Sequence, residues 1–189
     1  MTPALDRASL ELPGDCHARP HANCYWLVPG RVLAGEHPGV VPGTSATATV
    51  DALLDAGVRE FIDLTEEHEP APPYTAALRE RAEARGIRAR HRRFAIPDWG
   101  VPSDALMRSI LNSIHVALQA GDPVYLHCFA GVGRTGTVVG CLLRESGLSA
   151  DEALAIIAAK WRAMEKCQRH KKSPESPAQF ELIARWCRG

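Results

Sequence analysis

The chain has 189 residues, of which 46% are hydrophobic and 23% charged, a length and composition typical of one ordinary globular domain. Its 22 acidic and 22 basic residues balance, so no overall charge favours binding to nucleic acid or to a membrane surface. No apolar run approaches about 18 residues and no basic-then-apolar signal pattern opens the chain, which predicts a soluble, cytoplasmic protein with no membrane segment.

Residues 1–23 carry scattered prolines and little periodicity, and they predict a surface arm ahead of a domain over 24–189. Four residues of types that ligate zinc lie in or beside this arm: Cys16, His17, His21 and Cys24. Their spacing matches no paired C-x-x-C arrangement, so we expect no metal site there.

Strand and helix patterns alternate along the rest of the chain. The first half is expected to form a hairpin of strands 25–28 and 31–34, a helix over 46–56 capped by Thr44 or Ser45, a buried strand over 59–64, a helix over about 74–85 and a strand over 87–94. The second half is expected to form helices over about 104–120, 136–146, 150–168 and 178–187, with a buried strand over 124–127. This alternation predicts a single α/β domain with a central, mostly parallel, twisted sheet of about five strands flanked by helices.

Three charged segments lie between or after these elements. The acidic segment 65–70 follows a strand at the end that tends to face the site in α/β folds, but a solvated acidic loop is the plainer interpretation. The loop 95–102 carries one central acid, Asp98, between Pro97 and Gly100. The basic segment 166–172 is interpreted as a solvated helix end, with a basic rim of the site as the alternative.

One stretch carries the chemistry. The apolar run 124–127 leads into Cys128, and a glycine-rich loop then reaches Arg134 and Thr135 at the start of a helix. A strand–loop–helix unit of this kind aims backbone N–H groups at an anion bound by the helix N-terminus. A cysteine that faces a helix N-terminus and an arginine should have a lowered pKa, and its thiolate is a nucleophile.

Other interpretations of this loop fail. The glycines at 131, 133 and 136 match the dinucleotide-binding fingerprint, but no second strand with a terminal acid follows about 20 residues later. A Walker-type NTPase is excluded because no Gly-Lys-Ser/Thr follows the glycines. A purely structural cysteine would leave the Gly-x-Gly-Arg-Thr sequence without an explanation.

The His-Cys-x5-Arg-Thr run at 127–135 resembles the signature of the cysteine-dependent protein tyrosine phosphatases. The Ile-Pro-Asp at 96–98, where longer tyrosine-specific enzymes carry Trp-Pro-Asp, is similar to the dual-specificity branch. The resemblance extends from the hairpin near Tyr25 to the final helix. It implies the fold of these phosphatases and a mechanism that needs no metal or organic cofactor.

Phosphate-ester hydrolysis needs charge stabilisation on three oxygens, an in-line nucleophile and a protonated leaving group. Cys128 is the expected nucleophile, which forms a phosphocysteine intermediate. The expected phosphate-binding residues are Phe129, Ala130, Gly131, Val132 and Gly133 through their backbone, and Arg134 through its planar fork. Asp98 is the expected general acid, and in the second step it accepts a proton from water.

Three further residues complete the expected site. The hydroxyl of Thr135 is expected to hydrogen-bond the cysteine sulfur. By resemblance, His127 orients the loop and is not the base. Gln179 resembles the glutamine that positions the hydrolytic water in related phosphatases, with a solvent-facing helix residue as the equal alternative.

The apolar side chains of Phe129, Ala130 and Val132 favour a singly phosphorylated group, which is phosphotyrosine or phosphoserine/threonine in a protein, or a small phosphate ester. Alternatives are inositol phosphates, phosphoinositides or an RNA 5′-triphosphate, each of which wants a basic rim, and a module that binds phosphorylated ligands without turnover. The natural substrate and the oligomeric state stay open.

Six cysteines in this length do not make a disulfide framework. A low-pKa thiolate at Cys128 predicts reversible oxidation by peroxide. Cys141 and Cys24 are candidate thiols to resolve the oxidised form.

Overall fold

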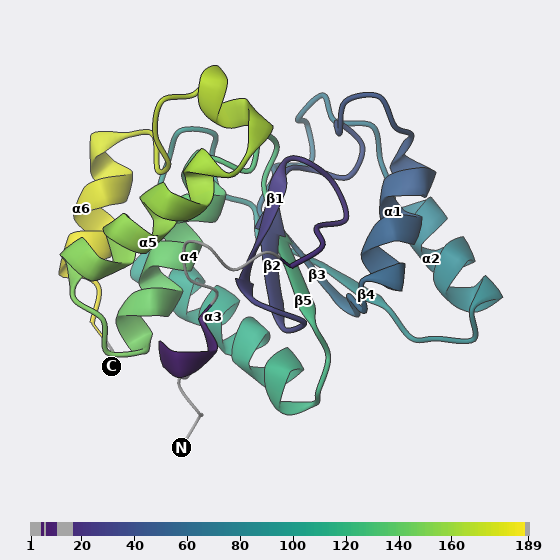
Figure 1. The fold of residues 1–189 in the computed structure, drawn as a ribbon, viewed down its shortest axis with the longest axis horizontal. Coiled ribbons are helices and arrows are strands. Elements are labelled where there is room, and N and C mark those ends of the chain that lie inside the picture. The colour runs from purple at the N-terminus through teal and green to yellow at the C-terminus, as the bar shows by residue number, and fades with distance from the viewer. Residues whose placement is uncertain (1–4, 6, 11–16, 188–189) are drawn as a thin grey trace.

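The computed structural model describes residues 5, 7–10 and 17–187. A five-stranded sheet runs through the centre of the molecule in the order β1-β2-β5-β3-β4 (Figure 1). Its strands are β1 (Cys24–Val28), β2 (Val32–Gly35), β3 (Glu60–Asp63), β4 (Arg90–Arg93) and β5 (Val124–His127). Only the β1–β2 pair is antiparallel, which confirms the predicted five-stranded, mostly parallel sheet.

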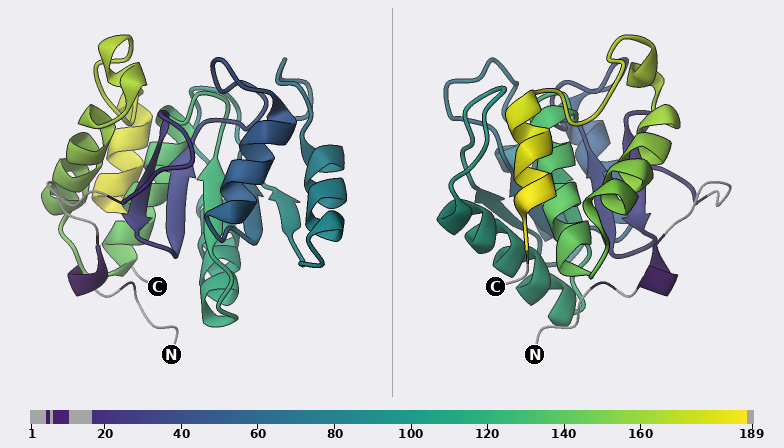
Figure 2. Two further views of the ribbon diagram at one scale, coloured as in Figure 1. Left: turned by 45° about the vertical axis from the view of Figure 1, so that its right-hand side comes forward. Right: turned by 90° about the vertical axis from the view of Figure 1, so that its left-hand side faces the viewer.

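Helices cover both faces of the sheet, and Figures 1 and 2 show the three layers. One face carries α1 (Ala46–Asp55) and α2 (Thr75–Ala84). The other face carries α3 (Asp104–Gln119), α4 (Gly133–Glu145), α5 (Ala150–Arg162) and α6 (Pro177–Arg185). Two short 3₁₀ helices, η1 (Arg7–Ser9) and η2 (Glu165–Gln168), complete the described elements.

Two hydrophobic cores lie on opposite faces of the sheet. Successive side chains of a strand point to opposite faces, so β5 sends Val124 and Leu126 into the core under α3–α6 and Tyr125 into the core under α1 and α2. A strand that is buried on both faces reads as a continuous apolar run, and this is why 124–127 was recognisable from its sequence.

Serine side chains cap the starts of four helices, α1, α3, α5 and α6. The Ser45 hydroxyl accepts the Ala48 N–H, and the Ser103 hydroxyl accepts the Leu106 N–H. Ser149 forms a full capping box with Glu152 at the start of α5.

Three predicted boundaries are wrong. The helix expected over 150–168 ends at Arg162, because Met164 is extended and the Lys166 N–H donates to the Asn23 side chain, 3.1 Å away, instead of continuing the helix. The helix expected from 136 begins at Gly133, inside the glycine-rich loop. The strand expected over 87–94 begins at Arg90, because the Ile87 N–H closes the C-terminal turn of α2.

The predicted N-terminal arm contributes side chains to the core. Leu5 and Leu10 are buried with the residues under α3–α6, so these two are not surface residues. Cys16, one of the zinc-type residues, lies outside the described residues, and the His21 ring nitrogen Nε2 lies 3.0 Å from the Tyr125 hydroxyl. Across residues 5, 7–10 and 17–187, no group of three or more His, Cys, Asp or Glu is arranged to hold a metal ion. Among these residues, no helix has both the length and the apolar character needed to cross a membrane.

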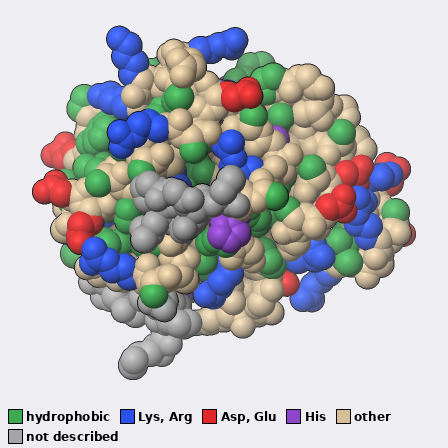
Figure 3. Space-filling model, in the orientation of Figure 1, with side chains coloured by type: hydrophobic (Ala, Val, Ile, Leu, Met, Phe, Trp, Pro, Cys, Tyr) green, Lys and Arg blue, Asp and Glu red, His purple; other side chains and the backbone are tan. Residues whose placement is uncertain are grey.

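Opposite charges are paired over the surface of α1 and α2. Arg81 pairs with Asp51, and Arg85 pairs with Asp51 and Asp55. Figure 3 shows acidic and basic side chains intermixed on this side of the molecule, so the balanced composition is also balanced locally here.

Helices α4 and α6 lie alongside one another, and one glycine sets their closeness (Figure 2). A Cβ on Gly140 would lie 2.4 Å from the Ile183 Cδ1 atom of α6, well inside van der Waals contact. This contact brings the first turn of α6 against the start of α4, where the glycine-rich loop ends.

We expect Gly140→Ala to lower the free energy of unfolding by about 1–3 kcal/mol, because the added methyl group overpacks the α4–α6 contact. Helix propensity alone predicts the opposite, a gain of about 1 kcal/mol. Urea denaturation of Gly140→Ala, Ile183→Ala and the double variant measures the coupling, and Ile183→Ala should cost less in the Gly140→Ala background. A Gly140→Ala protein more stable than wild type would contradict this packing argument.

Candidate active site

The last residues of the four parallel strands lie in one row. Register pairs Gly35 with His127, His127 with Asp63, and Asp63 with Arg93. The chain therefore leaves all four strands at the same edge of the sheet, where ligands bind in open α/β folds. The segments that leave this edge carry Glu36 and His37 after β2, Glu69 after β3, Asp98 after β4, and Cys128 to Arg134 after β5.

The loop after β5 has its carbonyl groups tied outward. The Phe129 oxygen accepts the His37 N–H at 3.0 Å, the Ala130 oxygen accepts the Lys166 ammonium at 3.2 Å, and the Val132 oxygen accepts the Ser173 hydroxyl at 2.8 Å. The N–H of a trans peptide points away from its C=O, so the N–H groups that follow these carbonyls face the opposite way. Among the described residues, no backbone N–H from 129 to 132 donates to another group of the chain. The loop can therefore offer these N–H groups to an anion.

Gly131 makes this curl possible. Its φ of +75° lies in the left-handed region, and a Cβ there would lie 2.5 Å from the Gly35 carbonyl group at the end of β2. Only glycine fits this position. The chain then enters α4 at Gly133, so the positive end of the helix dipole is directed to the same point.

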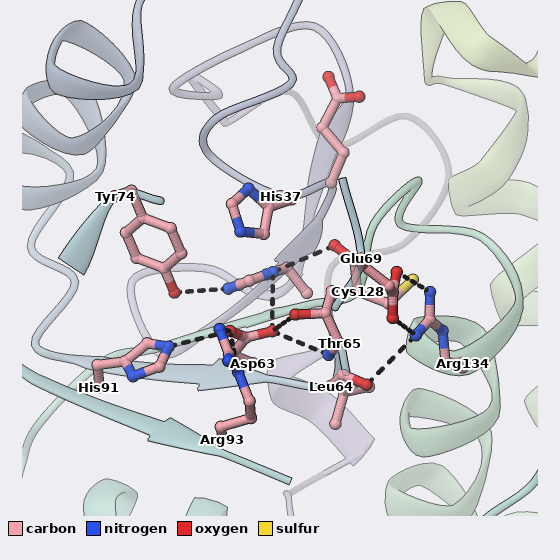
Figure 4. Close-up of polar contacts among 12 residues, drawn as sticks. His37, Asp63, Leu64, Thr65, Glu69, Tyr74, His91, Arg93, Cys128 and Arg134 are labelled. Atoms are coloured by element: carbon pink, nitrogen blue, oxygen red, sulfur yellow. Dashed lines mark hydrogen bonds and ion pairs between the residues drawn. The ribbon is translucent and has the colours of Figure 1, made fainter. Parts of the chain in front are cut away.

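Arg134, in the first turn of α4, is a buried guanidinium held by two carboxylates. Its two terminal nitrogens form a bidentate pair with Glu69 (Figure 4), and Nη2 also lies 3.0 Å from the Asp98 carboxylate. Nη1 donates to the Ile96 carbonyl at 3.1 Å. Burial alone would lower the pKa of Arg134, but its interactions with Glu69, Cys128 and Asp98 raise it above its ordinary value. The structure thus brings Arg134, Asp98 and Cys128 together.

Cys128 begins the loop and is 2% exposed. Its sulfur lies beside the Arg134 guanidinium in Figure 4, and the two groups interact electrostatically. The candidate nucleophile therefore lies beside a fixed positive charge that belongs to the first turn of α4.

Glu69 is the functional candidate that the sequence analysis missed. The loop 65–70 was interpreted as solvated, which is wrong for Glu69, because its side chain is 10% exposed and pairs with Arg134. The Glu66 N–H also donates to the Glu69 carboxylate at 2.8 Å and fixes its direction. The position of this loop at the carboxyl end of β3 was the signal that pointed to it.

Asp63, the last residue of β3, connects the loops through a buried carboxylate (Figure 4). It accepts hydrogen bonds from the Thr65 N–H and hydroxyl at 2.9 and 2.6 Å, and from the Arg93 Nε at 3.1 Å. His91 lies 3.0 Å away and His127 4.0 Å away. Burial raises the pKa of Asp63, but the pairing with His91, His127 and Thr65 lowers it well below its ordinary value.

His127 is buried with both ring nitrogens in contact. Nε2 lies 2.7 Å from the Tyr74 hydroxyl and Nδ1 lies 3.2 Å from the Cys128 carbonyl oxygen. Burial lowers the pKa of His127 to about 3, so the ring is neutral at neutral pH. These contacts suit a residue that orients the loop and do not suit a base that meets substrate.

Two predicted details of the site need correction. The Thr135 hydroxyl is buried and has no hydrogen-bond partner among the described residues, so the bond expected to the Cys128 sulfur is not formed. Gln179 is fully buried, which rules out the solvent-facing alternative. It lies against the loop, since a Cβ on Gly133 would be 2.9 Å from both polar atoms of the Gln179 amide.

Comparison with known proteins agrees with this geometry. A family model described as "Swiss Army Knife protein, DSP-PTPase phosphatase domain" matches residues 21–181. The chain belongs to this phosphatase family. Its cysteine loop is therefore not a dinucleotide-binding loop, the alternative that the glycine spacing formally allowed.

Relatives of this phosphatase domain include larger proteins. This chain is 33% identical over 89 residues to PTEN1 of Arabidopsis thaliana, a phosphatidylinositol 3,4,5-trisphosphate 3-phosphatase and protein-tyrosine-phosphatase. The match covers 46% of this chain and 22% of PTEN1. This chain is also 29% identical over 140 residues to the dual specificity protein phosphatase CDC14AB of Danio rerio. That match covers 70% of this chain and 21% of CDC14AB. The chain thus spans about a fifth of the length of these relatives.

A solved structure, Tk-PTP in the active form, is similar in fold. It superimposes with a TM-score of 0.60 at 27% identity and covers 81% of this chain and 88% of its own. The similarity supports the overall fold described above.

The first residue of the basic segment braces the loop of the phosphatase domain. Lys166 pairs with the fully buried Glu36 and donates to the Ala130 carbonyl. The Glu36 carboxylate also accepts the Asn23 amide at 2.9 Å. Lys166 is therefore neither solvated nor a free cation of a basic rim, while Figure 3 shows Lys and Arg side chains projecting at the surface around η2.

The candidate resolving thiols are buried. Burial raises the pKa of Cys24 to about 12 and raises that of Cys141 as well, so both are poor nucleophiles in the folded protein. No described cysteine is in a disulfide. Resolution of oxidised Cys128 by a second thiol stays a prediction.

We expect Glu69→Gln to lower kcat/KM by about 10- to 100-fold, because Arg134 loses the ionic partner that fixes its direction. The free energy of unfolding should fall by about 1–3 kcal/mol, since the buried guanidinium keeps fewer charged partners. Steady-state kinetics and urea denaturation measure the two effects. Glu67→Gln, in the same loop and exposed, is the matched control and should match wild type; equal behaviour of the two variants would contradict the role of Glu69.

Two buried histidines should make stability depend on pH. Burial lowers the pKa of His37 to about 4 and that of His127 to about 3, from an ordinary value of 6.5. The unfolded chain therefore binds protons below pH 6.5 that the folded protein does not bind until about pH 4, so the free energy of unfolding falls as the pH drops through this window. Each histidine contributes up to about 2 kcal/mol of loss by about pH 5.

His37→Gln tests this dependence. Between pH 7 and pH 5 the variant should lose about 2 kcal/mol less stability than wild type, as measured by urea denaturation at each pH. His68→Gln, at a side chain that is 80% exposed, should keep the wild-type dependence. The same pH slope in His37→Gln and wild type would show that His37 is not the titrating group.

Proposed function

We propose that this domain hydrolyses phosphate monoesters, with phosphotyrosine and phosphoserine/threonine of proteins as the main substrates, through a phosphocysteine intermediate on Cys128. The observation that carries the proposal is the arrangement around Arg134. A guanidinium, a buried cysteine, an exposed carboxylate and a loop with free N–H groups meet at one helix N-terminus. These are the groups that transfer of a phosphoryl group requires.

In the first step, the Cys128 thiolate attacks phosphorus and the P–S bond forms as the bond to the leaving oxygen breaks. The loop N–H groups and Arg134 bind the three remaining oxygens of the phosphoryl group. Asp98 gives its proton to the leaving oxygen, which departs as a neutral alcohol or phenol.

The contact between Asp98 and Arg134 explains how the acid reaches the leaving group. The Asp98 carboxylate lies 3.0 Å from Arg134 Nη2 and its side chain is 61% exposed, so it is free to move. Arg134 Nε has no hydrogen bond to a described residue. A phosphoryl group that binds Nε and Nη2 as a fork displaces Asp98 from Nη2 and leaves it beside the substrate.

In the second step, water attacks the phosphocysteine and the P–S bond breaks. The Thr135 hydroxyl, buried without a partner, is available to donate to the sulfur as it leaves as thiolate. Asp98 takes a proton from the attacking water. Inorganic phosphate then leaves the loop.

Apolar surface at the rim supports a singly phosphorylated substrate. Trp99, next to Asp98, is 61% exposed and offers a flat face to a substrate side chain. Lys166, which contacts the loop through the Ala130 carbonyl, is engaged by buried Glu36 and is not free to bind a second phosphate. Both observations favour a phosphorylated protein side chain over inositol phosphates, phosphoinositides or an RNA 5′-triphosphate.

Hydrolysis of p-nitrophenyl phosphate in the presence of chelator tests the proposal. We expect wild type to turn over, Cys128→Ser to be inactive, and Asp98→Asn to lose about 10²- to 10⁴-fold in kcat. Arg134→Lys should lose most activity, because a point charge cannot replace the planar fork. A wild-type protein that binds vanadate but turns over no substrate would instead support the binding-module alternative.

A panel of substrates tests the specificity. Phosphotyrosine and phosphoserine peptides should be hydrolysed with higher kcat/KM than inositol phosphates or phosphatidylinositol phosphates. The opposite order would replace the proposed substrate class.

A further inference from the structure

Gln179 cannot orient the attacking water in the arrangement observed. A water that directs a lone pair at phosphorus needs acceptors for its protons. The only acceptor of Gln179, its amide oxygen, already takes the Glu175 N–H at 3.0 Å and the Ser176 N–H at 3.2 Å. Its amide nitrogen donates to the Gly100 carbonyl at 3.1 Å. Gln179 therefore ties the Asp98 loop to α6 and has no acceptor left.

Glu175 offers the missing acceptor at the same place. A Cβ on Gly133 would lie 2.7 Å from the Glu175 Oε2 atom, and the carboxylate takes a backbone hydrogen bond from Gly133. The Val132 carbonyl is tied outward to Ser173, so the Gly133 N–H points to the side of the loop that offers its other N–H groups. Glu175 thus lies on the face of the loop that receives the phosphoryl group.

The surroundings of Glu175 hold its carboxylate in place without using all of its hydrogen-bond acceptor sites. Its side chain is 17% exposed, and Oε1 lies 3.5 Å from His170 Nδ1. Burial raises the pKa of Glu175, His170 lowers it, and the negative charge of Asp98 raises it. The Glu175 and Asp98 carboxylates therefore interact electrostatically. A carboxylate has about four acceptor sites, so Glu175 keeps free ones beside its contacts to His170 and Gly133.

We propose that Glu175 holds the attacking water in the second step of the reaction proposed above, on which this inference rests. The water oxygen attacks phosphorus, the new P–O bond forms, the P–S bond breaks, and its electron pair leaves on the Cys128 sulfur. One water proton passes to the Asp98 carboxylate. The other proton stays on the oxygen and is hydrogen-bonded to Glu175, which aims the lone pair at phosphorus.

This role separates the two steps of the reaction. Formation of the phosphocysteine needs Cys128, Arg134 and a protonated Asp98, and no water takes part in it. Breakdown of the phosphocysteine needs the water to be oriented. Loss of Glu175 should therefore slow the second step alone, while loss of Asp98 slows both.

Rapid-mixing kinetics with p-nitrophenyl phosphate test this separation in Glu175→Gln. We expect a burst of about one p-nitrophenolate per enzyme at the wild-type rate, followed by a steady state slowed at least about tenfold. Phosphorylated Cys128 should accumulate and be detected by mass spectrometry after acid quench. Glu181→Gln, an exposed carboxylate on α6, is the matched control and should behave as wild type.

The outcomes distinguish this inference from the proposed function. If wild type forms no phosphocysteine, or if Cys128→Ser stays active, the proposed function and the inference both fall. If wild type turns over normally but Glu175→Gln slows formation and breakdown equally, or slows neither, only the role of Glu175 is wrong. If a Gln179→Met variant accumulates phosphocysteine while Glu175→Gln does not, Gln179 and not Glu175 orients the attacking water.

Discussion

The candidate site depends on one buried positive charge. The Arg134 guanidinium is 2% exposed and stays ionised, so it needs negative partners in the place of water. Glu69 and Asp98 supply them beside Cys128, and each of the three comes from a different segment of the chain. The cost of leaving this cation unpaired in the protein interior is what draws three loops to one point.

Further ionic contacts hold these loops from both sides. On one side, the Asp63 carboxylate joins the start of the Glu69 loop to Arg93 and the two histidines of neighbouring strands. On the other side, Lys166 joins Glu36 to the backbone of the cysteine loop. The carboxylates at the centre of the two sets, Asp63 and Glu36, are fully buried, where the low dielectric strengthens their contacts. The loops can therefore keep their shape although they carry no regular secondary structure.

A structural feature can be predicted from the sequence when the residues that determine it are close together along the chain. The cysteine loop is one contiguous motif between a strand and a helix, so Cys128 and Arg134 were recognisable, and the alternation of elements was enough for the sheet. Glu69 pairs with a residue 65 positions away, and only the register of β3 beside β5 brings the two together. Likewise, local pattern favoured a helix through 163–168, but the contacts of Lys166 with Asn23 and Ala130 override it. Residues held by distant partners carry no local signal.

The hydrogen bonds that hold the carbonyl groups of the cysteine loop affect which ligands the domain can distinguish. Because His37, Lys166 and Ser173 already hold these carbonyls, the peptide dipoles are oriented before any anion arrives, and binding needs little reorganisation. A preorganised cradle of this kind recognises a tetrahedral oxyanion as such, whether it is ester, free phosphate or a mimic of the pentavalent state. For the proposed function, this preorganisation predicts product inhibition and sensitivity to oxyanion analogues. In that proposal, discrimination between substrates falls to the rim around Asp98 and Trp99, where the leaving group is expected.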